Sequence, residues 1–170
     1  MNNPEKLRSE SVWTTQELTK IALVAALYVA VTFVLQPVGY GNIQFRVAEM
    51  FNFLALYNKR YVWAVTLGCA IANLASPNGI LDVVVGSICT LFVLLLCRYV
   101  TRNLKDLRVK IAITAVIFAV SMFTVAAQLT ILFQAPFFFN WLTIGIGELL
   151  SMAIGGIIIY ALSQKIDLTA

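Results

Sequence analysis

The chain has 170 residues, 61% of them hydrophobic, and its mean hydropathy is +0.88. A soluble domain of this size needs more polar surface, so the composition predicts one integral membrane domain over residues 1–170. The net charge is +4, but the basic residues belong to short loops beside membrane spans, which favours contact with lipid and argues against nucleic-acid binding.

Six apolar segments predict an all-α bundle of six transmembrane helices. After a polar segment at residues 1–13, the helices are expected at about residues 14–36, 43–58, 60–76, 80–101, 108–134 and 138–163. A spanning helix needs roughly 20 apolar residues, so the second and third are short. Thr14, followed three residues later by Glu17, forms a capping box that predicts the start of the first helix. Prolines in the three connections expected outside support six passes: Pro37, Pro77 and Pro136.

Positive charge is distributed unevenly over the loops of this arrangement. Eleven of the twelve Lys and Arg residues share one face, and only Arg46 lies opposite. The positive-inside rule makes the basic face cytoplasmic, so both termini are predicted there. The most charged connection, Arg98 to Lys110, is interpreted as a topology anchor or as a docking surface for an anionic partner.

Small residues recur on one face of the first helix. Ala22, Ala26 and Ala30 are spaced four apart, which lets another helix approach closely in lipid. The stripe is suited either to a partner protein or to packing within the same chain.

Four ionisable residues are expected within the membrane, all in its outer half: Arg46, Glu49, Asp82 and Glu148. A charge deep in a bilayer costs at least ~2.5 kcal/mol, so such residues normally face a polar cavity. Arg46 and Glu49 are three apart and can form an ion pair on one helix face. Asp82 and Glu148 then have no basic partner expected at their depth. This excess of acid predicts a ligand with positive charge or several hydrogen-bond donors, unless the acids are protonated.

Further polar and aromatic side chains are expected near the same outer end. The amides of Asn73, Asn78 and Gln128 could hydrogen-bond a ligand, and Trp141 could stack on a flat one or belong to an interfacial aromatic belt. The first external loop carries Tyr40 and Gln44 and suits a lid or an ordinary connector. The three cysteines are interpreted as apolar packing residues: Cys69, Cys89 and Cys97.

Enzyme chemistry has little support in this sequence. No histidine is present, which excludes Ser-His-Asp catalysis and the usual histidine zinc sites, so we expect no enzyme, no metal and no cofactor. A proton-coupled carrier could use Glu49, Asp82 and Glu148 as a relay. A relay should continue into the inner half, however, where no acid is expected within a span.

Three stretches of the sequence resemble the QueT family of substrate-binding S components from energy-coupling factor transporters. They are Phe45-Arg46-Val47-Ala48-Glu49, the run Asn73-x-x-Ser76-Pro77-x-Gly79-x-x-Asp82-x-x-x-Gly86-Ser87, and Gly147-Glu148. The resemblance implies a six-helix subunit in the plasma membrane of a prokaryote that captures a micronutrient at the outer face. It implies a membrane coupling protein, met by the Ala-rich first helix, and two cytoplasmic ATPases as partners. Since no nucleotide-binding loop is present, those partners would hydrolyse the ATP.

The same resemblance implies a queuosine precursor as ligand. This is a deazaguanine whose aminomethyl group would suit Asp82, Glu148 or Glu49. A pyridoxine-like or hydroxymethylpyrimidine-like vitamin is the alternative, because both kinds of ligand offer a ring face for Trp141 or Tyr40 and polar edges for the amides.

Overall fold

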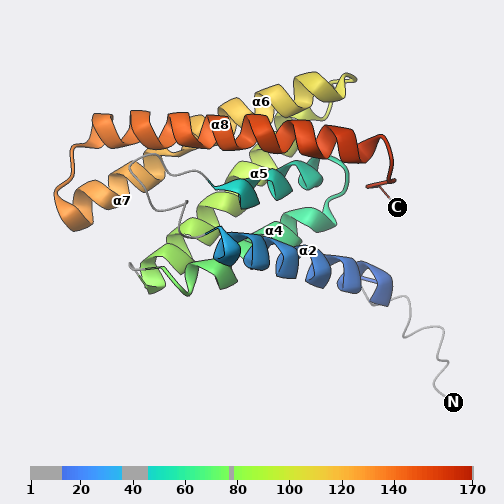
Figure 1. Cartoon of the computed structure of the whole chain (residues 1–170), viewed down its shortest axis with the longest axis horizontal. Helices are drawn as coiled ribbons and strands as arrows, with labels where there is room; N and C mark the ends of the chain where they lie inside the picture. Colours follow the sequence, from blue (N-terminus) through green and yellow to red (C-terminus); the bar gives the residue numbers. More distant parts are fainter. Residues whose placement is uncertain (1–12, 36–45, 77–78, 170) are drawn as a thin grey trace, which may run out of the picture.

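The computed structural model describes residues 13–35, 46–76 and 79–169, which fold as helices without a strand (Figure 1). The all-α class expected from the sequence is therefore confirmed for this part of the chain. The elements, in order, are α2 (Thr15–Val34), η1 (Val47–Leu56), α4 (Arg60–Asn73), η2 (Asp82–Gly86), α5 (Ser87–Thr101), α6 (Leu107–Ser121), α7 (Phe123–Phe133) and α8 (Phe137–Ser163).

Four helical stretches are long and apolar enough to cross a membrane: Thr15–Val34, Asp82–Thr101, Leu107–Phe133 and Phe137–Ser163. Their outward faces carry large exposed hydrophobic side chains, among them Phe92, Ile131 and Ile157. Exposed apolar surface of this extent is suited to lipid. The chain is therefore a multi-pass membrane protein. η1 and α4 have 10 and 14 residues, short for a span, so the count of six passes stays a prediction.

Three of the expected helices differ in form from uniform α-helix. The second is a 3-10 helix over Val47–Leu56, and the fourth begins as the π-helix η2. The fifth, predicted as one helix over residues 108–134, breaks at Met122 into α6 and α7. Hydroxyls beside this break donate to backbone carbonyls, Ser121 to Phe118 at 2.7 Å and Thr124 to Ser121 at 2.9 Å. Such bonds compete with the helical ladder and bend helices.

The start of α2 confirms the predicted capping box. The Glu17 amide donates to the Thr14 hydroxyl at 3.3 Å, and the Thr14 amide donates to the Glu17 carboxylate at 2.9 Å. Each bond satisfies an amide that has no partner within the helix.

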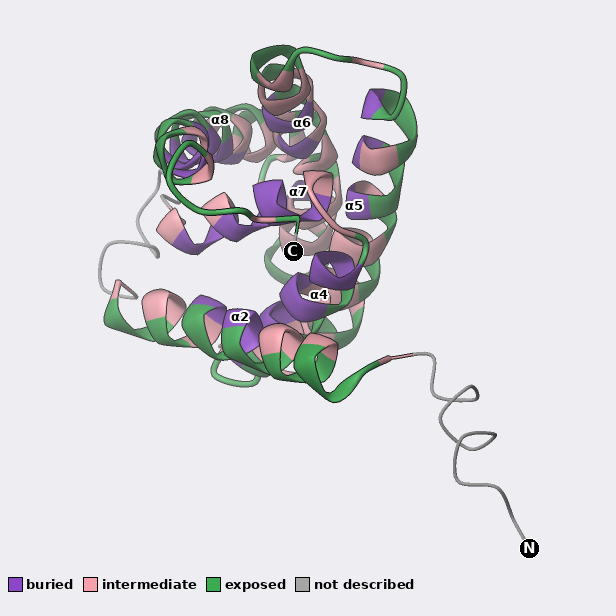
Figure 2. Ribbon diagram, turned by 90° about the vertical axis from the view of Figure 1, so that its right-hand side faces the viewer, coloured by how far each residue is buried: buried purple, intermediate pink, exposed green. Residues whose placement is uncertain are grey.

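The core of the bundle forms around η1, which packs against α2, α4, α5, α6 and α8. Phe53 of η1 is fully buried, and the buried faces of the surrounding helices turn inward (Figure 2). Two glycines let α8 pack closely. A Cβ atom on Gly155 would lie 2.5 Å from the Cβ of Met50 in η1, and one on Gly156 would lie 2.7 Å from Ile111 in α6. Only glycine permits this approach.

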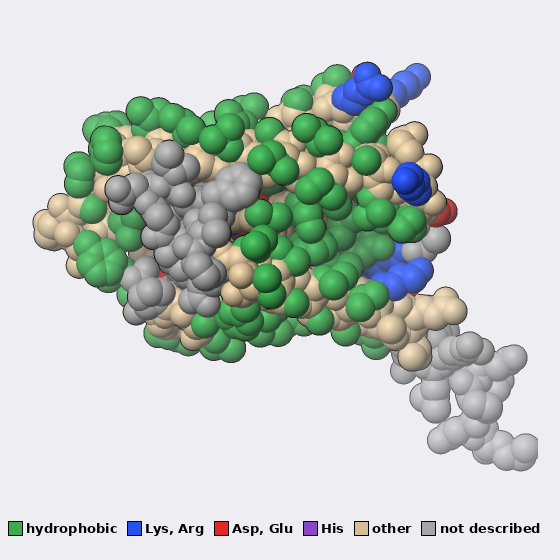
Figure 3. Space-filling view, viewed as in Figure 1, with side chains coloured by type: hydrophobic (Ala, Val, Ile, Leu, Met, Phe, Trp, Pro, Cys, Tyr) green, Lys and Arg blue, Asp and Glu red, His purple; other side chains and the backbone are tan. Residues whose placement is uncertain are grey.

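One end of the bundle is basic. The start of α2 and the end of α8 lie at the same end (Figure 1), where the visible Lys and Arg side chains gather (Figure 3). The segment after α8 crosses this end (Figure 2). There the Thr169 carbonyl accepts hydrogen bonds from Asn58 at 3.2 Å and Arg60 at 3.3 Å. That this end is cytoplasmic stays a prediction from the charge pattern.

Candidate functional site

The 3-10 form of η1 aligns the polar residues of the second helix. In a 3-10 helix, side chains three apart eclipse one another, so Glu49 and Asn52 follow one edge, and Arg46 precedes them as the residue that caps η1. With residues from two neighbouring helices they form a polar group within the core, here called the acidic cluster: Tyr28 of α2, Arg46, Glu49 and Asn52 of η1 and its cap, and Glu148 and Ser151 of α8. Glu49 is 9% exposed and Glu148 is 2% exposed.

Glu49 lies at the centre of this cluster. Its carboxylate accepts hydrogen bonds from the Tyr28 hydroxyl at 3.1 Å and from the Asn52 side-chain amide at 2.5 Å. Arg46 interacts electrostatically with Glu49, as the three-residue spacing predicts, and also with Glu148. The expectation that Glu148 has no basic neighbour is therefore wrong. Packing against α8 brings Arg46 to it.

The acidic cluster lies deeper along α8 than the sequence predicts. The Arg46 amide donates to the Ser151 hydroxyl at 2.9 Å, and that hydroxyl donates to the Gly147 carbonyl at 2.8 Å. Ser151 is near the middle of α8 (Phe137–Ser163), so the start of η1 is level with the middle of α8 and not with its first turn, where the sequence predicts it. The short length of η1 explains this difference, because it reaches only part of the way along the bundle.

Glu148 has unused hydrogen-bonding capacity. Its Oε1 atom is buried without a hydrogen-bond partner in the described part of the chain, and the Oδ1 atom of Asn52 is in the same state. A buried carboxylate oxygen without a donor is costly, and native proteins keep few of them. Such an atom in the middle of a bundle is the expected mark of a site that a donor from outside the described residues completes.

Asp82 is the centre of a second polar group, here called the Asp82 network. Its carboxylate accepts hydrogen bonds from the Ser76 hydroxyl and from the Gln128 amide, and its backbone carbonyl accepts from Asn73 at 3.0 Å. These bonds connect α4, η2 and α7. Of the amides predicted as ligand-binding, Asn73 and Gln128 do converge, but on Asp82.

Cys69 lies between the two groups. Its sulfur is within hydrogen-bonding distance of the Asn73 amide at 3.4 Å and the Thr90 hydroxyl at 3.5 Å. It also interacts with Tyr28 and, electrostatically, with Glu49. This cysteine is buried, as predicted for a packing residue, but it also takes part in polar contacts.

Trp141 lies in α8, beside the break between α6 and α7. Its indole nitrogen donates to the Val120 carbonyl at 3.1 Å, and its ring centroid is 5.9 Å from that of Phe137. The described contacts thus attach α8 to α6 and leave the predicted stacking on a ligand untested. Tyr40, Gln44 and Asn78, with the proposed lid at residues 36–45, lie outside the described residues.

The sequence analysis did not predict the polar contacts of several residues in and between these groups: Tyr28, Asn52, Ser76, Cys69 and Ser151. Spacing could have found two of them, because Asn52 and Ser151 each stand three residues after a buried glutamate and are the polar residues next on that face. Tyr28 gave no such signal, since its partner is on another helix. Among the described residues, no group of three or more His, Cys, Asp or Glu side chains could hold a metal.

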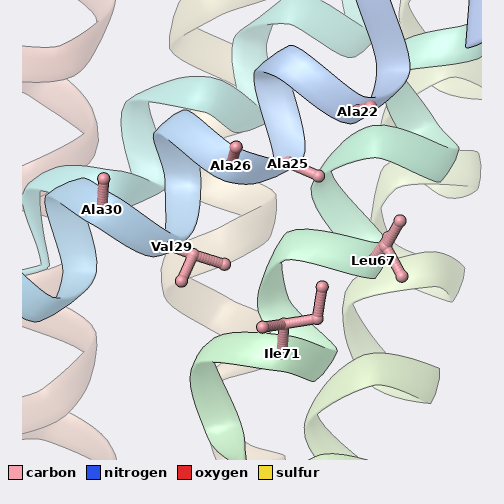
Figure 4. A pocket seen from close by; sticks show the side chains of 7 residues that line it. All are labelled: Ala22, Ala25, Ala26, Val29, Ala30, Leu67 and Ile71. Atoms are coloured by element: carbon pink, nitrogen blue, oxygen red, sulfur yellow. The ribbon is translucent and has the colours of Figure 1, made fainter. Parts of the chain in front are cut away.

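The alanine stripe of α2 faces outward. Ala22, Ala26 and Ala30 are exposed, and together with Ala25, Val29, Leu67 and Ile71 they line an apolar groove of about 450 Å³ between α2 and α4 (Figure 4). Gly68 lets the two helices approach below the groove, because a Cβ atom there would lie 2.8 Å from the Cβ of Tyr28. Within the described part of the chain, the stripe is therefore free for another helix.

Comparison with known proteins gives a consistent result. The QueT transporter family matches residues 18–164. The queuosine precursor transporter QueT of Lactococcus lactis subsp. cremoris (strain MG1363) is 40% identical over 164 residues, which cover 91% of this chain and 96% of that protein. No solved structure matches significantly.

Proposed function

The chain belongs to the QueT transporter family, and we propose that it is the substrate-binding S component of an energy-coupling factor transporter. In this role it captures a queuosine precursor at the outer face of a prokaryotic plasma membrane. A membrane coupling protein and two cytoplasmic ATPases then drive import.

The observation that carries the proposal is the open carboxylate of Glu148. It is buried in the middle of the bundle beside Arg46 and Glu49, and its Oε1 atom has no described donor. A site with convergent polar groups inside an apolar bundle is typical of small-molecule binding. The relative is named a queuosine precursor transporter, and we take its substrate as the ligand. A deazaguanine with a basic aminomethyl group has both hydrogen-bond donors and a positive charge, which acidic residues attract.

A second observation supports the partners. The groove of α2 and α4 is apolar and exposed, and its small residues permit helix-to-helix contact in lipid, where close packing provides much of the attraction. The acidic cluster and the groove share α2: Tyr28 donates to Glu49 inside the bundle, while Ala26 faces out.

Transport by the reconstituted chain tests the mechanism. The chain alone in liposomes should bind the aminomethyl deazaguanine without concentrating it, and uptake should require the coupling protein, the ATPases and ATP. Uptake against a gradient by the chain alone, driven by a proton gradient, would instead show a proton-coupled carrier. Binding of pyridoxine or hydroxymethylpyrimidine in place of the deazaguanine would contradict the proposed substrate.

The partner surface has a separate test. Ala26→Leu places bulk in the groove and should weaken assembly with the coupling protein by about tenfold, which corresponds to roughly 1.4 kcal/mol. Ligand affinity should stay nearly constant, because Ala26 faces away from the acidic cluster. Ala112→Leu, the same change at an exposed alanine of α6, is the matched control and should leave assembly unchanged. Equal loss of assembly in both variants would contradict this docking surface.

A further inference from the structure

Of the three acids in the two polar groups, Glu148 is the one whose carboxylate is open. Glu49 already accepts from Tyr28 and Asn52, and Asp82 accepts from Ser76 and Gln128. Among the described residues no hydrogen bond reaches Glu148, although it is 2% exposed. Its position is fixed by the buried middle of α8, next to Gly147 and close to the Ser151–Arg46 contact.

The neighbours of this carboxylate define the chemistry that it can recognise. The Arg46 amide donates to the Ser151 hydroxyl at 2.9 Å, one helical turn from Glu148, so Arg46 and Glu148 belong to the same part of the bundle and interact electrostatically. A guanidinium offers several N–H donors, and a carboxylate offers two acceptor oxygens. The two side chains thus present a donor and two acceptors. A guanine-type ring presents the complement along one edge: a carbonyl oxygen, a ring N–H and an exocyclic amino group.

A carboxylate is well matched to two parallel N–H donors, because each oxygen accepts one of them in a charge-assisted bond. A single ammonium group, such as the aminomethyl end of the ligand, does not present two parallel N–H donors, so it matches the two carboxylate oxygens less well. We therefore propose that Glu148 reads the N–H edge of the guanine-type ring by accepting from the ring N–H and from the exocyclic amino group, with Arg46 beside the carbonyl oxygen. This inference rests on the proposed function, since it requires a deazaguanine-type ligand.

Glu49 has a different part in this arrangement. Its carboxylate is held by Tyr28 and Asn52, and it interacts electrostatically with both Arg46 and Glu148. It is a positioning residue that keeps Arg46 near Glu148 through opposite charge. The ring edge is read by Glu148 itself.

The experiment compares two ligands that differ only at that edge. The full chain in lipid nanodiscs is titrated by calorimetry with the aminomethyl deazaguanine and with the corresponding deazahypoxanthine, which lacks the exocyclic amino group. Both ligands carry the aminomethyl cation. The parent protein should bind the deazahypoxanthine about ten- to a hundredfold more weakly, because one acceptor of Glu148 is left unpaired.

Glu148→Gln tests the residue. The new side-chain NH₂ opposes a ligand donor, so affinity for the deazaguanine should fall by about ten- to a hundredfold and the preference over deazahypoxanthine should shrink to about threefold or less. Asp82→Asn is the matched control, an identical isosteric change in the Asp82 network, and should keep the parent's preference. If Glu148→Gln does not fold, the ratio of the parent protein's affinities for the two ligands tests the proposal.

Two outcomes would overturn the inference while leaving the proposed function intact. One is equal affinity of the parent for the two ligands. The other is an equal weakening of both ligands in Glu148→Gln, which would assign the aminomethyl group to this acid. Failure of the parent to bind any deazaguanine would overturn the proposed function itself, and the inference with it.

Discussion

Asp82 and Glu148 are both acids within predicted membrane spans, but the structure gives them different surroundings. Asp82 is half-buried, and donors from Ser76 and Gln128 occupy its carboxylate. Glu148 is buried beside charged neighbours and accepts no hydrogen bond from the described residues. We assign the acid whose oxygens are already bonded to the stability of the fold, and we propose the acid without a described donor for ligand binding. Depth in a membrane alone does not separate these roles.

The largest expected effect comes from removing the central acid of the acidic cluster. Glu49→Ala leaves the buried Tyr28 hydroxyl and Asn52 amide without their acceptor and removes a charge that faces Arg46. The free energy of unfolding in detergent should fall by about 3–5 kcal/mol. Asp82→Ala removes an acceptor for two neutral donors at a half-buried position and should cost roughly 1–3 kcal/mol. Equal losses would show that burial does not separate the two groups.

Isosteric changes at the two acids should differ in their main effect. The change at Glu148 should have the larger effect on ligand affinity, and the change at Asp82 should have the larger effect on stability. Glu148→Gln should lower affinity for the aminomethyl deazaguanine by about ten- to a hundredfold, because an amide presents a donor where an acceptor is needed. Asp82→Asn should lower the unfolding free energy more than Glu148→Gln does, because it weakens two existing bonds. Calorimetric titration and thermal unfolding of the two variants measure both quantities. The same ranking in both measurements would contradict the division between ligand site and structural network.

Two glycines make close contacts, Gly155 with Met50 beside Glu49 and Gly86 with Asn73 of the Asp82 network. The first contact is with a Cβ and backbone atoms, and the second is with the end of a side chain. In Gly155→Ala the new Cβ would meet the Met50 Cβ at 2.5 Å and its Cα at 2.8 Å, which displaces η1 and costs about 1–3 kcal/mol of stability. In Gly86→Ala the new atom would meet the end of the Asn73 side chain at 2.6 Å, which can move. Gly155→Ala should therefore be the less stable variant by thermal unfolding. It should also bind ligand more weakly, since η1 carries Glu49.

The smallest expected effect tests one hydrogen bond of the acidic cluster. Tyr28→Phe keeps the ring but removes the donor to Glu49, so the unfolding free energy should fall by about 0.5–1.5 kcal/mol. Tyr99→Phe is the control, because Tyr99 is 63% exposed and loses little when its hydroxyl is removed. A stability of Tyr28→Phe indistinguishable from the control would show that Asn52 alone satisfies Glu49.

The sequence by itself determined the membrane class, the four long apolar helical stretches and the start of α2. These features depend on runs of apolar residues and on a capping box whose members are three residues apart. It also identified the charged residues Arg46, Glu49, Asp82 and Glu148, because ionisable side chains inside apolar segments are costly in a membrane and normally have a polar partner or a function. All of this information is local in the chain.

Only the tertiary structure decided which partners each of these residues meets. Arg46 is bonded through its backbone to Ser151, 105 positions away, and Asp82 is bonded to Gln128, 46 positions away. Such contacts follow from how helices pack, which depends on Gly155 and Gly156, on the 3-10 form of η1 and on the break at Met122. Spacing along the chain places a residue on a face of its own helix. The partner that it meets is set by the neighbouring helix, so the open carboxylate of Glu148 and the occupied one of Asp82 were alike in sequence and differ in the fold.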